Sequence, residues 1–185
     1  MINDIFSSLK DNWQSIATEC NAIDRNNIMD IDVTSLSRED VAHALVKSQK
    51  PQWIRGWDGH NGWLNYGIAI NYNYPLGDAG LPYTTSLLKK ISGIKFANLS
   101  LFKAGTFLPM HAHPEMLAEG LLTFHLGLDV PLGCYLSVDG EFEREENGKA
   151  IIFDGSKSHY AFNDSDKDRL ILYCEFSSQN IHALN

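Results

Sequence analysis

The chain has 185 residues, of which 44% are hydrophobic and 21% are charged, and these ordinary globular values exclude a disordered protein. The net charge of −8 argues against a nucleic-acid surface, because phosphate binding needs clustered lysine and arginine. Three isolated cysteines (Cys20, Cys134 and Cys174) without CxxC spacing indicate neither a disulfide framework nor a thiolate metal site. The sequence shows no signal-peptide pattern and no bilayer-length apolar stretch, which predicts a soluble, cytoplasmic protein without membrane partners.

The first fifty residues predict helices. Apolar residues between positions 2 and 19 recur at three- and four-residue spacings, the pattern of an amphipathic helix. A second helix is expected over 37–47, where Ser37 has the position of an N-cap and Asp40 stands three residues later. We therefore predict a helical N-terminal extension over residues 1–50 that packs outside the remainder of the chain.

After Pro51 the sequence favours strands. The aromatic and β-branched segment 63–75 predicts a strand, and 84–91 predicts a short helix. Six further short strands separated by Gly, Pro or Asp are expected at 95–102, 123–131, 133–140, 148–154, 158–163 and 169–176. Short strands without helices between them indicate a mainly β protein, a cupin-like jelly roll or double-stranded β-helix over residues 51–185. The extension and this β-rich part are expected to form a single structural domain.

The segment LPMHAHPEM (108–116) places His111 and His113 one residue apart, so that both imidazoles point the same way on an extended chain. A jelly roll brings distant strands together at one mouth, and His159, after the turn-forming Asp-Gly-Ser, is the natural third member. Three imidazoles suit Fe(II), Zn(II) or Mn(II). The motif of a glycine (Gly105), five intervening residues and HxH is also the first signature of the cupins. The alternative is that two histidines in a loop bind nothing.

Two further residues have structural interpretations on their own. His125 lies inside an apolar strand segment, where a hydrogen-bonded core histidine is the common outcome. Arg169 follows the polar stretch NDSDKD, which predicts an edge cation paired with one of those aspartates and contributing little to stability.

A series of ordered motifs between about Gly62 and Phe176 resembles the aspartyl/asparaginyl β-hydroxylase family of Fe(II)- and 2-oxoglutarate-dependent oxygenases. HAHP resembles the family's H-T-G-P, and HLGLDVP matches H-L-G-L-x-V-P. GKAIIFDGSKSHYAFN matches G-K-x-x-x-F-D-D-S-x-x-H-x-x-x-N and is followed by an arginine ten positions past its histidine. GWLNYGI, PYTTSLLKKISG and LSLFKAGTFLP are similar to the family's first strand, short helix and serine-containing strand.

The resemblance implies a role for individual residues. His111 and His159 would be the iron-binding, catalytic histidines. Arg169 and Ser100 would hold the distal carboxylate of 2-oxoglutarate, for which a bidentate guanidinium is suited. His125 would contact this cosubstrate beside the metal. The implied reaction uses O2 to hydroxylate an amino-acid-like or peptidyl substrate, with release of succinate and CO2.

The chain departs from the family pattern at two places. His113 stands where relatives have a carboxylate or a glycine, and it either becomes a third ligand or turns outward and leaves water in its place. The family's R-L-R-x-H segment is LLTFH here (121–125), so both arginines are absent and an acidic substrate is disfavoured. These departures leave two alternatives open: a cupin-type three-histidine metalloenzyme without 2-oxoglutarate, or a non-catalytic metal- or ligand-binding domain.

Residues near the expected mouth bear on the substrate. Glu115 and Glu119 favour a basic or neutral substrate, unless they simply belong to a solvated loop. Trp57, Asn61 and Trp63 are expected to line the pocket, with core packing as the alternative for Trp63.

Overall fold

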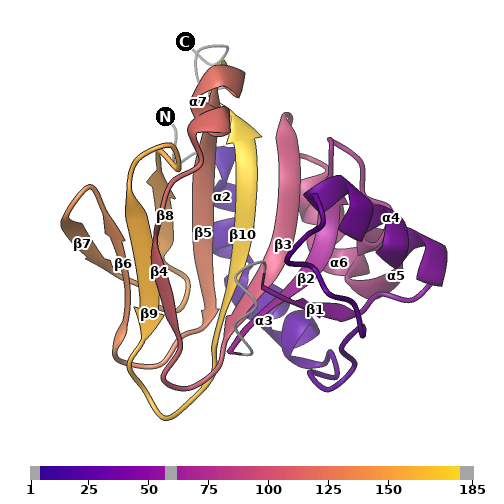
Figure 1. Cartoon of the computed structure of the whole chain (residues 1–185), viewed down its shortest axis with the longest axis horizontal. Helices are drawn as coiled ribbons and strands as arrows, with labels where there is room; N and C mark the ends of the chain where they lie inside the picture. The colour runs from indigo at the N-terminus through magenta and orange to yellow at the C-terminus, as the bar shows by residue number, and fades with distance from the viewer. Residues whose placement is uncertain (1–4, 57–61, 180–185) are drawn as a thin grey trace.

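The computed structural model describes residues 5–56 and 62–179 and consists of two facing antiparallel sheets with helices outside the larger one (Figure 1). The larger sheet has the strand order β1-β2-β3-β10-β5-β8 and the smaller one β4-β9-β6-β7. The strands are β1 (Trp53–Arg55), β2 (Trp63–Ile70), β3 (Ile94–Phe102), β4 (Phe107–His111), β5 (Leu121–Asp129), β6 (Cys134–Val138), β7 (Glu141–Arg144), β8 (Ala150–Phe153), β9 (His159–Asn163) and β10 (Arg169–Ser177). The helices are α2 (Ser7–Asp11), α3 (Trp13–Asn21), α4 (Arg38–Ser48), α5 (Gly77–Gly80), α6 (Pro82–Leu88) and α7 (Pro114–Glu119). The predicted mainly β, cupin-like jelly roll is confirmed.

Both faces of the larger sheet are used, because successive side chains of a strand point to opposite sides. One set of side chains from β3, β5 and β10 joins the main hydrophobic core, namely Ala97, Leu99, Leu101, Phe124, Leu126, Leu128, Leu170, Leu172, Cys174 and Phe176. The intervening residues, including Ser100, His125 and Arg169, line a cavity between the two sheets. The alternation therefore separates an apolar outer face from a polar inner face.

Helices α2 and α3 cover the outer face of the larger sheet (Figure 1), whereas Val41 and Leu45 of α4 pack with Ile54 and Leu76 on its opposite face. Phe6 stacks on Phe124 of β5 with ring centroids 4.0 Å apart, and it is fully buried together with Leu9 and Ile16. Burying each such side chain contributes roughly 1.5–3 kcal/mol. The helices lie outside the sheets as expected, while the boundary between residues 50 and 51 stays a prediction.

The helix expected over 2–19 is two helices, α2 and α3, separated at Asn12. The Asn12 side chain donates to the Ser8 carbonyl at 2.8 Å and accepts from the Tyr83 hydroxyl at 2.8 Å, so local side-chain bonds compete with a continuous helix there. The helix predicted over 37–47 is confirmed as α4. Ser37 caps it in a capping box with Asp40.

Three other predicted boundaries or elements differ. The strand expected over 63–75 ends at Ile70, because Asn71 and Tyr72 have left-handed φ angles of 47° and 66° in a turn closed by Asn73. The helix expected over 84–91 begins at Pro82, whose fixed φ suits a first helical turn, and ends at Leu88. Strands β1, β4 and β7 were not predicted.

All three cysteines are buried and free, as the sequence predicted. In the stretches 5–56 and 62–179, none of the helices has both the length and the apolar character needed to cross a membrane.

Candidate metal centre

His111 reaches the space between the sheets because β4 is irregular. Leu108 pairs with Ala161 of β9, whereas His111 pairs with His159, so β4 takes three steps where its partner takes two. In a regular strand Leu108 and His111 would face opposite sides. The extra residue, next to Pro109, returns the His111 side chain to the cavity that Leu108 also lines.

His113 is held close to His159 by the backbone. It is the N-cap residue of α7, and its N–H donates to the Gly155 carbonyl at 2.9 Å in the turn before β9. A Cβ at residue 155 would lie 2.7 Å from Thr123 Oγ1, which explains the glycine at this close approach. The His113 ring therefore lies beside those of His111 and His159, and its role as a third ligand stays a prediction.

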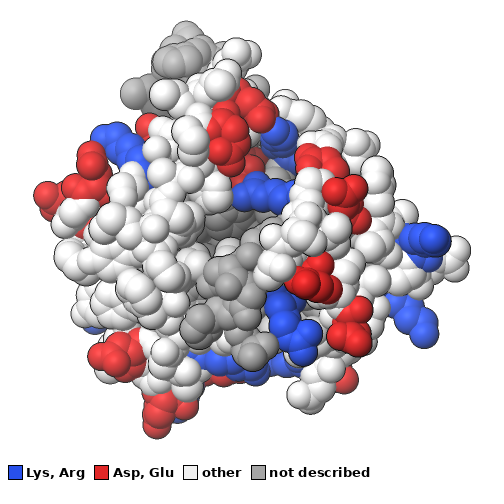
Figure 2. Space-filling view, in the orientation of Figure 1, with Lys and Arg blue, Asp and Glu red and all other residues white. Residues whose placement is uncertain are grey.

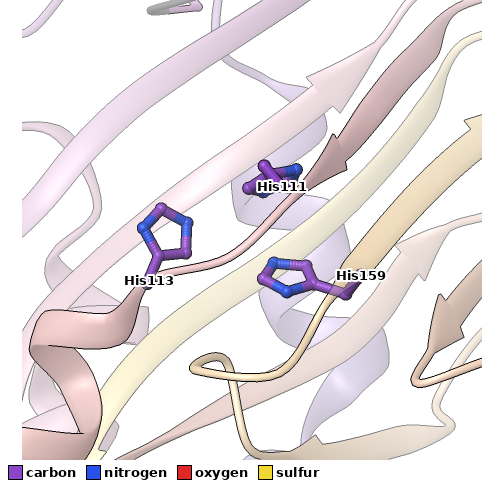
Figure 3. Close-up of side chains that lie close together, drawn as sticks. All are labelled: His111, His113 and His159. Carbon is purple, nitrogen blue, oxygen red and sulfur yellow. The ribbon is translucent and has the colours of Figure 1, made fainter.

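His111, His113 and His159 converge in space (Figure 3). One ring nitrogen of each lies within 4.8 Å of the others, and the ring centroids of His111 and His159 are 4.2 Å apart. Small side-chain rotations from this arrangement bring three nitrogens to about 2.1 Å from one shared ion.

The Nδ1 atom of each ring already has a hydrogen-bond partner. His111 Nδ1 lies 2.7 Å from the Pro109 carbonyl, and His159 Nδ1 lies 2.8 Å from the Lys157 carbonyl. His113 Nδ1 lies 3.2 Å from Glu115 Oε1. Such partners hold the proton on Nδ1 and leave the Nε2 lone pair for a metal. The donor set therefore fits a divalent ion, although the metal and catalytic roles of the three residues stay predictions.

The protonation of the cluster also suits a metal. Burial lowers the pKa of His159 to about 4 despite the bond to the Lys157 carbonyl. Burial, followed by the nearby Arg38 charge, lowers the pKa of His113 as well. Both rings are neutral at pH 7, and neutral imidazole is the form that binds metals.

The cluster lies in a cavity of about 530 Å³ between the sheets. Figure 2 shows the hollow on this face, with basic and acidic side chains next to each other along its upper rim. Much of the lining is apolar, for example Leu136 and Ile171. Trp63 lines the cavity as expected and donates from its indole N–H to Ser100 Oγ at 3.1 Å. The other two pocket residues predicted, Trp57 and Asn61, lie outside the described residues.

Arg169 is buried, but its partner differs from both sequence interpretations. Its Nε donates to Glu145 Oε2 at 2.6 Å, and its Nη2 donates to Glu145 Oε1. His125 Nδ1 lies 3.1 Å from the same Oε1. The expected pairing with an aspartate of NDSDKD is wrong, because Asp168 instead pairs with Arg25 and Lys103.

Glu145 is ionised in this arrangement. Burial alone would raise the pKa of its carboxyl, but Arg169 and His125 more than reverse that effect and lower it to about 2. For His125 the effect of burial, which lowers the pKa, is larger than that of the Glu145 carboxylate, which raises it, so the pKa is lowered. The three residues thus form a buried cation, anion and neutral imidazole with no net charge.

A second arginine lines the cavity mouth. Arg38, the first residue of α4, donates to Glu175 Oε1 at 2.5 Å, and its guanidinium lies 4.9 Å from the centroid of Phe96. Tyr173 also donates to Glu175 at 2.8 Å. Glu115 lines the same mouth.

The charges of this cavity do not match those of 2-oxoglutarate, which has two carboxylates. A second carboxylate at the inner end of the cavity needs an unmatched cation, and the charge of Arg169 is already matched by Glu145. Ser100 and His125 lie where they can contact a ligand, but the cavity as built does not fit a dicarboxylate. The cosubstrate roles of Ser100, His125 and Arg169 stay predictions.

Sequence reasoning missed Glu145 and Arg38. Glu145 belongs to the acidic segment EFEREEN (141–147), in which the other glutamates, Glu141, Glu143 and Glu146, are not buried. Its only distinguishing feature is its place directly after β7, where the chain crosses from the smaller sheet to the larger one. Arg38 has the local sequence of an ordinary first helical residue, and nothing in that sequence points to the cavity.

Two facing antiparallel sheets define a cupin-like fold, and the three histidines that converge at its mouth are a possible metal site. The chain belongs to the aspartyl/asparaginyl beta-hydroxylase family, whose model matches residues 10–179. The resemblance inferred from the motifs is therefore confirmed: the chain is a member of this family with a possible three-histidine metal site.

Relatives of known name agree with this assignment. The chain is 38% identical over 116 residues to an ornithine lipid ester-linked acyl 2-hydroxylase of Rhizobium tropici, covering 61% of this chain and 39% of that protein. It is 31% identical over 125 residues to the human aspartate beta-hydroxylase domain-containing protein 2, covering 65% and 33%. Among solved structures it is similar to KdgF from Halomonas sp., with a TM-score of 0.41, 15% identity and coverage of 70% and 90%. The matched segment thus spans about two-fifths or less of the two named hydroxylase relatives.

Proposed function

We propose that the protein is an Fe(II)-dependent hydroxylase that uses O2 and a 2-oxo acid to convert a C–H bond of its substrate to C–OH. The observation that carries this proposal is the convergence of His111, His113 and His159 in a cavity of a member of this hydroxylase family. In the form that the family resemblance implies, the 2-oxo acid is 2-oxoglutarate and the products include succinate and CO2.

In this function the three histidines would bind the metal and the apolar lining of the cavity would hold the substrate. His111, His113 and His159 would hold the ion through three neutral nitrogens and leave its remaining positions open to small ligands. The bound iron supplies the activation of O2. The apolar lining excludes water from the reacting groups and orients the C–H bond.

The substrate proposed is an uncharged group of an amino-acid-like, peptidyl or acyl compound. The polar side chains that line the cavity beyond the metal cluster include Asn65, Asn98 and Ser100, which are neutral hydrogen-bonding groups. The name of the Rhizobium relative, an acyl 2-hydroxylase, supports an apolar chain as one form of this group. The absence of arginines at positions 121 and 123 argues against an acidic substrate.

A second function is favoured by one observation. Glu145 gives the buried Arg169 a structural partner, so this arginine needs no ligand. The same arrangement is expected in a cupin-type three-histidine metalloenzyme that uses no 2-oxo acid. Arg169→Met combined with Glu145→Met, which removes both charges of the pair, would leave metal-dependent turnover intact in that enzyme.

The test is O2 consumption by the protein loaded anaerobically with Fe(II), measured with a panel of 2-oxo acids and uncharged acyl or amino-acid compounds. CO2 release that requires both Fe(II) and a 2-oxo acid supports the proposal. His159→Ala is the inactive control, and the exposed His43→Ala is the matched neutral control. Tight metal binding without turnover of any 2-oxo acid would support a binding domain or the second function instead.

A further inference from the structure

The charges around the cavity are matched in pairs. Every Lys and Arg of the chain lies within residues 5–56 and 62–179, and of these only Arg38 and Arg169 line the cavity. Arg169 is paired with Glu145, whose exposed fraction is 4%, and Arg38 with Glu175, at 3%. A ligand inside the cavity therefore finds no lysine or arginine whose charge is unmatched.

We propose that Glu145 makes this site select a 2-oxo acid with an uncharged tail and reject one with a second carboxylate. The proposal rests on the proposed function, since it names the class of 2-oxo acid that the hydroxylase uses. Glu145 would act through Arg169 as a selectivity-determining residue and would not touch the ligand.

A second carboxylate cannot displace Glu145 easily. The Glu145 side chain accepts from Arg169 and contacts His125, and its backbone N–H donates to the Cys134 carbonyl at 3.0 Å. Freed from Arg169, it would remain a buried carboxylate without a cation, which is a costly state. If Glu145 stayed in place, two carboxylates would share one buried guanidinium.

Arg169 can still bind an uncharged group. Glu145 engages its Nε and Nη2, and Nη1 is left as a donor toward a carbonyl, hydroxyl or ether oxygen. The Ser100 hydroxyl, which accepts from Trp63, keeps its own hydrogen for the same ligand atom. The inner end of the cavity thus offers donors without net positive charge.

The other end of the cavity has the opposite preference. Three neutral imidazoles leave the full double positive charge on the bound ion, because His113 stands where a carboxylate would cancel part of it. An anionic group is therefore favoured at the metal and disfavoured at Arg169. A 2-oxo monocarboxylate with an uncharged tail has this distribution of charge.

The reaction balances with such a cosubstrate. The 2-oxo acid loses CO2 and becomes the carboxylic acid one carbon shorter, while the substrate C–H becomes C–OH. One oxygen atom of O2 enters the carboxylic acid, the other becomes the new hydroxyl group, and CO2 receives neither. Of the four electrons that reduce O2, two come from the 2-oxo acid and two from the substrate carbon.

The test compares 2-oxoglutarate with its 5-dimethylamide, which has an uncharged tail and no amide N–H that could close a ring onto the ketone. Anaerobic calorimetric titration of the Fe(II)-loaded protein gives the dissociation constant of each, and CO2 release under O2 gives the turnover. The wild type is expected to bind the amide more tightly by about tenfold or more. In Glu145→Gln, which leaves the Arg169 charge unmatched, the order should reverse.

Controls separate this role from a structural one. Glu145→Asp should keep the wild-type order, and the exposed Glu141→Gln should change nothing. The preference is the ratio of two dissociation constants measured on the same protein, so partial destabilisation of a variant does not alter it. If Glu145→Gln fails to fold, the ratio measured for the wild type decides. Wild-type protein that binds 2-oxoglutarate as well as the amide would overturn the inference and leave the proposed function standing. Failure of every 2-oxo acid to bind would overturn the proposed function itself.

Discussion

Replacing Arg169 by methionine should strongly destabilise the protein. The change leaves the Glu145 carboxylate buried beside a neutral His125 with no cation. Removing one partner of a buried ion pair typically costs about 3–5 kcal/mol. The depression of the Glu145 pKa from its usual 4.5 to about 2 gives a similar figure of about 3 kcal/mol.

The pH dependence of this loss distinguishes a charge effect from a packing effect. In the wild type the Glu145 pKa is lowered on folding, so its stabilising contribution is present above about pH 4.5 and is lost as the pH falls toward 2. In Arg169→Met burial raises the same pKa, so the carboxyl takes up a proton and the variant recovers as the pH falls. The difference in stability between the two proteins should therefore shrink from pH 7 to pH 5.

The measurement is urea denaturation of metal-free wild type and variant at both pH values, with thermal melting as a second assay. A loss of 3–5 kcal/mol corresponds to a fall in melting temperature of about 6–20 °C for a chain of this size. Arg169→Met combined with Glu145→Met should recover most of the loss, because an apolar pair replaces the ion pair. A single-variant loss under about 1 kcal/mol, or a difference that does not change with pH, would refute the reasoning.

Three further outcomes are expected. His159→Ala should abolish the metal-induced rise in melting temperature. In the wild type, an ion at 100 times its dissociation constant adds about 2.7 kcal/mol to the free energy of unfolding. A rise that persists in the variant would place the ion elsewhere. His113→Asp should retain Fe(II) and Mn(II) binding in calorimetry, whereas His113→Ala should weaken it by about tenfold or more, and equal affinities would remove His113 from the ligand set. Asn65→Leu with Asn98→Leu should raise the free energy of unfolding in urea by about 1–3 kcal/mol, because Asn65 Nδ2 and Asn98 Oδ1 are buried without a hydrogen-bond partner among the described residues; an unchanged stability would show that these amides are satisfied in solution.

The sequence predicted the fold well where strands are apolar and end at turn residues. Segments 95–102 and 169–176 correspond closely to β3 and β10, since their alternating apolar residues build the main core. It failed for β4 and β7. FLPMH contains a proline and forms a strand because it pairs with the distant β9, whereas the mostly charged EFER forms a strand because it completes a hairpin with β6.

The candidate metal site was accessible from the sequence because its residues belong to short motifs. His111, His113 and His159 stand at fixed distances from glycine and proline turns, and the fold only has to bring two motifs together. Glu145 and Arg38 were not accessible in this way. Their burial depends on where the chain crosses between sheets and on which helix end reaches the cavity mouth, and local composition contains neither kind of information.

The inner and outer faces of the larger sheet explain how this cavity can change its chemistry without losing its fold. Leu99, Phe124 and Leu172 point outward and are fully buried, so they stabilise the fold through apolar packing in the core, whereas inward neighbours such as Arg169 affect stability through their charge. The inner positions need only keep their charges matched. At 121 and 123 the family arginines are replaced by leucine and threonine, and at 145 a buried carboxylate appears. The two replacements and the buried carboxylate all lower the positive charge around the cavity, which is the change that a ligand with an uncharged tail requires.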